Sequence, residues 1–312
     1  MPSIPILRSS SLANSISRTY ILNVTMGGNN QQLPLQLDTG SSDLVGFPWL
    51  FPRHVNLTRM QWAASTSCTG CGNVNGGLYD PTGSLPTGQS FAINYLAGSA
   101  AGPIVWDKVT VGGYTVQHQA LGMINLTPPH HVLTIRPSAA ASDVEDEPLD
   151  AFSGILGLAL PPNSVIASTL SAGDPVGADG ATWASNLFGM DGAPASRFIS
   201  FLLERPGSAT ISSLLGIGMH PSDYVTDPSK VHYSTLVSGK TGATFWKTSV
   251  TAITVYVDGE PKPVTISPSA SGSAFPTAVM DTGVPVILMT STLANGIYGA
   301  LDIHPAQDKN CE

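Results

Sequence analysis

One pattern occurs twice in this chain, first as Leu35-Gln36-Leu37-Asp38-Thr39-Gly40 and again as Ala278-Val279-Met280-Asp281-Thr282-Gly283. Each copy is an apolar strand that runs into Asp-Thr-Gly. A chain of this composition contains about 0.14 such triplets by chance, so two copies are not expected at random. One triplet alone is most often an ordinary Asp-initiated turn. The pair, each at a strand end, indicates a repeated unit that carries a carboxylate.

The repeated turns predict a site built from two carboxyl groups. Glycine lets the backbone approach closely, so backbone N–H groups of each turn can hold the carboxylate behind them. Two turns face to face bring two carboxyls together, and one proton is shared because like charges so close cannot both ionise. The ionised carboxyl can take a proton from water while the protonated one hydrogen-bonds a peptide carbonyl. This chemistry requires no metal, cofactor or covalent intermediate.

The composition favours many short strands. The 312 residues include 32 Gly and 25 Pro, and 42% of them are hydrophobic, which is enough for a core but unfavourable for long helices. Only 11% are charged, with a net charge of -8, so a nucleic-acid-binding surface is not expected. No apolar run reaches the roughly 20 residues that span a membrane. We therefore predict a mostly β protein.

The apolar segments and turn residues locate the expected elements. Strands are predicted at residues 18–25, 33–37, 90–95, 105–111, 114–121, 199–203, 245–257 and 278–280, with turns at Asn29-Asn30, Gly112-Gly113 and Asp258-Gly259. Helices are predicted at residues 182–188 and 291–301, the second with Ser291 or Thr292 as its N-cap.

The chain resembles the pepsin-like aspartic proteases, above all those of basidiomycete fungi, from about Thr19 to about Pro305. The resemblance rests on five stretches: Asp38–Leu44, Ile93–Ser99, Phe152–Leu158, Gly216–Gly218 and Ala278–Gly283. It implies an all-β, bilobal fold with the active site in the cleft between the lobes. The N-terminal lobe would span residues 1–196 and the C-terminal lobe residues 197–312.

The resemblance also implies roles for single residues. Asp38 and Asp281 would be the catalytic dyad. Active-site support is implied for Thr39, Gly40, Ser41, Thr282 and Gly283. The two threonines would brace the two loops, and the serine would hydrogen-bond Asp38.

Further roles are implied outside the two loops. Tyr95, Gly98 and Ser99 would belong to a flap that closes over the substrate. Ile155-Leu156-Gly157 would thread behind the first active-site loop. Cys68 and Cys71 would form a small disulfide loop.

The expected activity is an acid endopeptidase that cuts extended polypeptides between large hydrophobic residues. No metal, cofactor, nucleic acid or membrane is expected, and we expect a monomer. The resemblance and the sequons at Asn23, Asn56 and Asn125 suit an extracellular protein, although abundant Ser and Thr also produce sequons by chance. The first 17 residues lack a signal-peptide pattern, so the signal peptide and pro-segment are expected to be missing from this sequence.

The sequence departs from the family pattern at two inserted stretches. Removing Val45–Gln61 joins Leu44 to Trp62 and restores the family pattern, and Met123–Arg136 has no family counterpart. Translated introns and natural surface insertions both account for these stretches, and a transcript sequence would distinguish them.

The second copy of the repeat departs from the family in two ways. Val284 stands where the family has Ser or Thr, so Asp281 would lose a hydrogen bond. Gly154 follows Asp38 by 116 residues, whereas 31 residues follow Asp281. We therefore expect a missing C-terminal segment, an unpaired Cys311, and an exposed edge and apolar face beside Asp281. On this reasoning the chain made as written is expected to be unstable or inactive.

Two other functions remain open from the sequence. A pepsin-like module that binds without cutting is one alternative, and the retention of both aspartates disfavours it. A zinc site of Cys68, Cys71 and a histidine is another, but it lacks a second ligand pair with suitable spacing.

Overall fold

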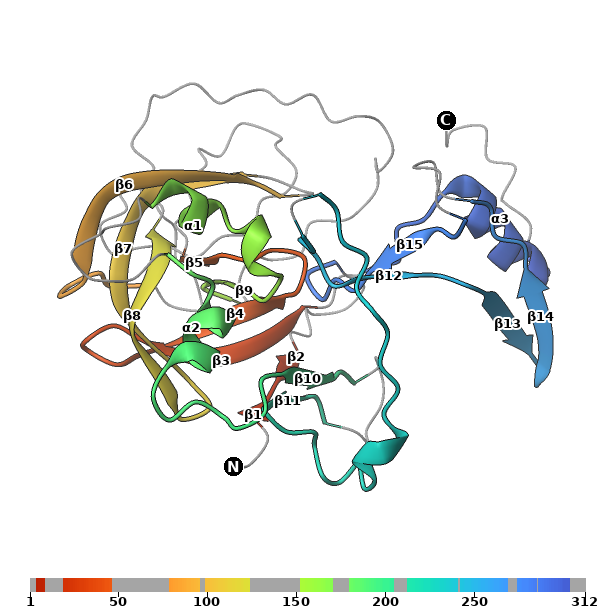
Figure 1. The fold of residues 1–312 in the computed structure, drawn as a ribbon, viewed down its shortest axis with the longest axis horizontal. Helices are drawn as coiled ribbons and strands as arrows, with labels where there is room; N and C mark the ends of the chain where they lie inside the picture. The colour runs from red at the N-terminus through yellow and green to blue at the C-terminus, as the bar shows by residue number, and fades with distance from the viewer. Residues whose placement is uncertain are drawn as a thin grey trace, which may run out of the picture.

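The computed structural model describes residues 4–8, 19–46, 79–95, 99–123, 152–170, 180–204, 212–240, 242–268, 274–284 and 286–303. These residues form mostly strands with a few short helices (Figure 1), which confirms the predicted all-β class. No helix in the described ranges is long and apolar enough to cross a membrane.

An eight-stranded sheet carries the first copy of the repeat. Its order is β2 (Leu7–Arg8), β3 (Tyr20–Met26), β4 (Gln31–Asp38), β9 (Gly154–Gly157), β5 (Leu44–Gly46), β8 (Tyr114–Met123), β7 (Ser99–Val111) and β6 (Leu85–Asn94). Strand β9 runs parallel to β4, although more than 100 residues separate them in the chain. Alternate residues of β3 and β4, among them Leu22, Val24, Leu35 and Leu37, are fully buried in one core.

A second sheet lies against this core. It contains β1 (Ile4–Pro5), β11 (Leu214–Ile217) and β10 (Ile199–Leu202). Leu215 and Ile217 are buried in the same cluster as the side chains of β3 and β4. The predicted lobe boundary near residue 197 stays a prediction.

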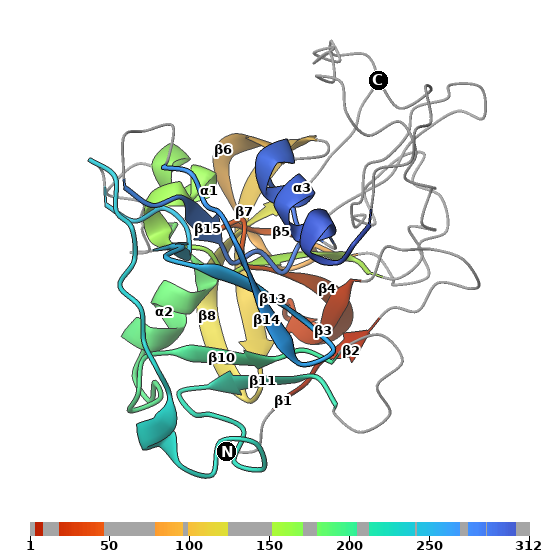
Figure 2. The ribbon, with the colours of Figure 1, turned by 90° about the vertical axis from the view of Figure 1, so that its right-hand side faces the viewer.

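The second copy of the repeat lies in a smaller group of elements. This group contains β12 (Lys247–Ser249) paired with β15 (Thr277–Val279), the hairpin β13 (Ile253–Val257) and β14 (Glu260–Val264), and α3 (Ser291–Ala300). Helix α3 lies beside β13 and β14 (Figures 1 and 2), and Figure 1 shows it apart from the eight-stranded sheet. Large apolar side chains are exposed here, among them Val279, Met280, Val286, Ile287 and Leu288.

The short helices differ in how well the sequence predicts them. Helix α2 (Trp183–Gly189) begins after Thr182, whose side chain caps it, close to the prediction. Helix α3 is capped by Thr290, so the predicted cap at Ser291 or Thr292 is wrong by one or two residues. The 3₁₀ turn η2 (Pro161–Asn163) and the helix α1 (Val165–Thr169) were not expected.

The strand predicted at residues 245–257 is two strands, because β12 pairs with β15 while β13 pairs with β14.

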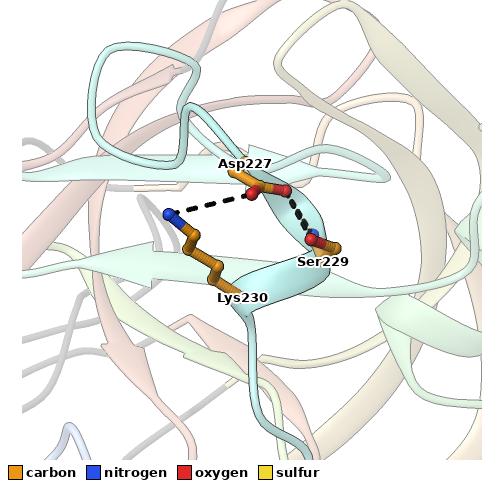
Figure 3. A network of polar contacts seen from close by, with 3 residues as sticks. All are labelled: Asp227, Ser229 and Lys230. Atoms are coloured by element: carbon orange, nitrogen blue, oxygen red, sulfur yellow. Dashed lines mark hydrogen bonds and ion pairs between the residues drawn. The ribbon is translucent and has the colours of Figure 1, made fainter.

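The 3₁₀ turn η3 (Pro228–Lys230) is capped by Asp227, which accepts hydrogen bonds from Ser229 and lies 3.9 Å from the Lys230 ammonium (Figure 3). This pair is exposed, so it contributes little to stability.

Candidate active site

The two Asp-Thr-Gly turns hold their carboxylates in the same way. Asp38 ends β4, and Asp281 lies two residues after β15. The Gly40 N–H donates to Asp38 Oδ1 at 2.8 Å, and the Gly283 N–H donates to Asp281 Oδ1 at 2.8 Å. The identical local geometry explains why the same three residues recur at both strand ends.

The structure brings the two carboxyl groups together across facing turns. A Cβ atom on Gly40 would overlap the carboxylate of Asp281, and a Cβ atom on Gly283 would overlap that of Asp38. Each carboxylate therefore lies directly against the turn of the other loop. Only glycine fits at these two close approaches.

Hydrogen bonds between Thr39 and Thr282 join the two loops. The Thr39 N–H donates to Thr282 Oγ1 at 3.1 Å, and the Thr282 N–H donates to Thr39 Oγ1 at 2.9 Å. The Thr39 hydroxyl donates to the Met280 carbonyl oxygen (2.7 Å), and the Thr282 hydroxyl donates to the Leu37 carbonyl oxygen (2.8 Å). Each hydroxyl thus donates and accepts, which fixes both loops in one arrangement.

Asp38 is a buried acid with a raised pKa. Its side chain is 7% exposed, and Ser41 Oγ donates to its Oδ2 at 2.5 Å. Burial raises the pKa of Asp38 to about 6, and the Asp281 charge adds to this, while the Ser41 and Gly40 hydrogen bonds act against it. The neutral form of Asp38 is therefore favoured below about pH 6.

Strand β9 supports the first loop from behind. The Leu158 N–H donates to the Asp38 carbonyl oxygen at 2.7 Å. A Cβ atom on Gly157 would overlap the backbone of Ser42 and Asp43, so the strand can pass this close only with glycine. Ile155-Leu156-Gly157 therefore lies where the resemblance implies.

Tyr95 lies near the dyad at the end of β6. Asn94 pairs with Ser99 at the start of β7, so Tyr95 enters the turn of a long hairpin. Burial and the nearby Asp38 and Asp43 carboxylates raise the pKa of the Tyr95 phenol well above its ordinary value.

Asp43 links the first loop to α1, a role that the sequence pattern does not predict. Its buried carboxylate accepts bonds from Ser164 Oγ (2.6 Å), the Val165 N–H (2.8 Å) and the Ile166 N–H (3.2 Å). Burial raises its pKa, and these bonds act against that rise. The partners lie at least 121 residues away, so no local sequence signal identifies them.

The surroundings of Asp281 are more open. Asp281 is half-buried, and the preceding Met280 is 56% exposed. Val284 takes the place in the second turn that Ser41 takes in the first, and a valine side chain cannot donate a hydrogen bond to Asp281. The two halves of the site are thus alike in backbone and unequal in surroundings.

Several predicted features lie outside the described residues. They are Cys68, Cys71, Gly98, Cys311 and nearly all of the two inserted stretches. Val45, which opens the first insertion, is fully buried in β5 and pairs with Ile155 and Gly122. In the part of the chain that is described, no group of three or more His, Cys, Asp or Glu side chains could hold a metal ion.

The chain is similar to known aspartyl proteases. Residues 19–311 match the eukaryotic aspartyl protease family. Syncephapepsin of Syncephalastrum racemosum is 32% identical over 154 residues, which are 48% of this chain and 30% of that protein. Secreted aspartic protease 6 of Candida albicans is 34% identical over 118 residues, which are 36% of this chain and 26% of that protein.

The fold also matches a solved protease. The crystal structure of the aspartic proteinase from Irpex lacteus superposes with a TM-score of 0.55 at 19% identity, covering 96% of this chain and 68% of that one. At this identity the match supports the fold alone. The chain matches less than a third of the length of the two curated relatives named above.

Proposed function

Because the chain belongs to the eukaryotic aspartyl protease family, we propose that it hydrolyses peptide bonds with a water activated between Asp38 and Asp281. One observation carries this proposal. Each carboxylate is held by a glycine N–H of its own turn and lies against the turn of the other loop. This arrangement suits two carboxyls that share one proton.

The proposed reaction uses the two carboxyls in opposite roles. Burial favours the neutral form of Asp38, which donates its proton to the carbonyl oxygen of the scissile peptide. Ionised Asp281 takes a proton from the water, whose oxygen bonds to the carbonyl carbon. As the resulting diol collapses, one of its hydroxyls returns a proton to Asp38, the C–N bond breaks, and the leaving nitrogen takes the proton that Asp281 accepted from the water. The dyad then again holds one proton, on Asp38.

The substrate is inferred to be an extended polypeptide with hydrophobic residues around the cut. The position of Tyr95, at the turn of the β6–β7 hairpin beside Asp38, suits a flap that covers such a substrate. The raised pKa of Asp38 supports action in acid, because activity requires its proton. A relative bears the name Secreted aspartic protease 6, in line with an extracellular location. That the chain is a monomer and binds no nucleic acid stays a prediction.

A second candidate is a chain that binds peptides but cuts them slowly or not at all. The exposed Met280 and Val279 beside Asp281, and the missing hydroxyl at Val284, favour it. The assembled threonine bonds favour the protease. The expected instability or inactivity of the chain stays a prediction.

Digestion of acid-denatured haemoglobin tests the proposal. Cleavage in acid that pepstatin blocks and that Asp38→Asn abolishes, while Asp258→Asn, at an exposed turn, cleaves like the wild type, would establish the proposal and overturn the predicted inactivity of the chain. Peptide binding without cleavage in the folded wild-type protein would instead establish the second candidate.

A further inference from the structure

Hydrogen bonds form a closed ring around the two aspartate loops. The Leu158 N–H donates to the Asp38 carbonyl oxygen (2.7 Å), and the Trp246 Nε1–H donates to the Leu158 carbonyl oxygen (2.7 Å). The Met280 N–H donates to the Trp246 carbonyl oxygen (2.9 Å), and Thr39 Oγ1 donates to the Met280 carbonyl oxygen (2.7 Å). Thr39 follows Asp38 in the chain, which closes the ring.

Trp246 is the one ring member that belongs to neither loop nor to the segment behind the first loop. It lies just before β12, so its backbone bond to Met280 extends the ladder between β12 and β15. Its indole N–H donates to the carbonyl oxygen of Leu158, 88 residues earlier in the chain. One residue therefore contacts the support of the first loop and the strand that delivers the second aspartate.

From this geometry we infer that Trp246 is a positioning residue for the proposed reaction, and that its indole N–H sets the placement of Asp281 relative to Asp38. The inference rests on the proposed function. The Thr39 hydroxyl already holds the carbonyl oxygen of Met280, directly before Asp281, and Trp246 adds a second restraint there by accepting from the Met280 N–H. The bonds between the two threonines hold the residue after Asp281. Fixing the second loop on both sides of Asp281 restrains its carboxylate more than either restraint alone.

The position of Met280 makes this restraint important. Met280 is 56% exposed and Val279 is 42% exposed, so little packing holds this side of β15. A displacement of about 1 Å in reacting groups can cost about 100-fold in rate. Losing the indole bond should therefore lower the rate of turnover strongly and lower the free energy of unfolding only slightly.

Trp246→Phe removes the N–H and keeps an aromatic ring. The matched control is Trp183→Phe, because the indole N–H of Trp183 has no hydrogen-bond partner among the described residues. Benzothienylalanine at position 246 is a second variant, since it replaces the N–H by sulfur at nearly constant shape. Trp246 is 40% exposed, so both changes at position 246 avoid the core, whereas Trp183 is fully buried. Benzothienylalanine at position 183, which keeps the ring volume, therefore accompanies Trp183→Phe as a control.

The first measurement is an NMR titration of the Asp38 carboxyl carbon, which requires no turnover. The titratable groups that face Asp38 are Asp281 from the second loop and Tyr95 from the end of β6. Burial and Asp281 both raise the Asp38 pKa, so looser loops should lower the titration midpoint, by about half a pH unit or more. We expect this shift in both Trp246 variants and no shift in Trp183→Phe.

The second measurement is peptide hydrolysis by the same proteins. We expect kcat to fall about tenfold or more in the Trp246 variants while KM stays within about twofold. An unchanged Asp38 midpoint in both variants would overturn the inference, whatever happens to activity. A wild-type protein that does not cleave would overturn the proposed function, and the titration would still decide the role of Trp246.

Discussion

Replacing Asp38 with Asn should remove much of the pH dependence of folding stability. Burial raises the pKa of Asp38 from 3.8 to about 6. That shift of about two units corresponds to about 3 kcal/mol, at about 1.4 kcal/mol per unit. Because the folded chain holds this proton more tightly than the unfolded chain, the stabilisation is complete below pH 3.8 and is lost as the pH rises through 6.

Urea unfolding at about pH 4 and about pH 7 measures the effect. The wild type should lose about 2 kcal/mol more than Asp38→Asn between these two conditions, since at about pH 4 the unfolded chain already holds part of the proton. Asn does not titrate, and its Oδ1 still accepts from the Gly40 N–H. Its Nδ2 takes the place of the Oδ2 that accepts from Ser41, so the serine hydroxyl must turn to accept from that amide. Asp43, whose pKa is also raised, stays in both proteins, so its contribution cancels.

Asp258→Asn is the matched control for this experiment. Asp258 is an exposed turn residue with a φ of 52°, a conformation that Asn tolerates, so its stability profile should follow the wild type. Equal pH dependence in the wild type and Asp38→Asn would refute the reasoning. A larger loss of stability with rising pH in the variant would refute it as well.

Three further outcomes test other parts of the structure. Ser41→Ala should raise the pKa of Asp38, because the serine hydrogen bond lowers it, so activity should persist to higher pH; an unchanged pH profile would contradict this. Asp43→Ala should reduce the free energy of unfolding by about 1–3 kcal/mol, because it leaves the N–H groups at the start of α1 unpaired, and Asp43→Asn should reduce it less. Ile287 is 84% exposed, and Ile287→Lys should reduce binding of a hydrophobic dye without loss of folding; equal dye binding would show that this side chain is not part of the exposed apolar face.

The sequence predicted those features that depend on neighbouring residues. The strands of the main sheet follow from apolar residues at alternate positions, and the turns at Gly112-Gly113 and Asp258-Gly259 follow from residues that tolerate positive φ, which all four adopt. The repeated Asp-Thr-Gly triplet identified both carboxylates, because the glycine N–H that holds each of them lies within the triplet.

Features that depend on distant residues could not be predicted from sequence pattern alone. Helix α1 has five residues and no strong periodicity, and its start is held by Asp43, more than 100 residues earlier. Trp246 reads as part of one long strand, yet its indole bonds to a carbonyl at the end of β9. Long-range hydrogen bonds leave no spacing in the sequence, so only the fold reveals them.

The two copies of the repeat share one sequence motif, yet their carboxyl groups differ in burial. Both carboxylates accept a glycine N–H at 2.8 Å, so the turns themselves do not distinguish them. The surroundings do, because Asp38 is buried with β9 behind its loop, whereas Asp281 is half-buried beside exposed apolar side chains. Burial penalises charge, so the shared proton is expected to reside on Asp38. Covering the exposed side of β15 would make the surroundings of the two aspartates more alike. Which aspartate holds the shared proton is therefore expected to depend on what packs against that strand.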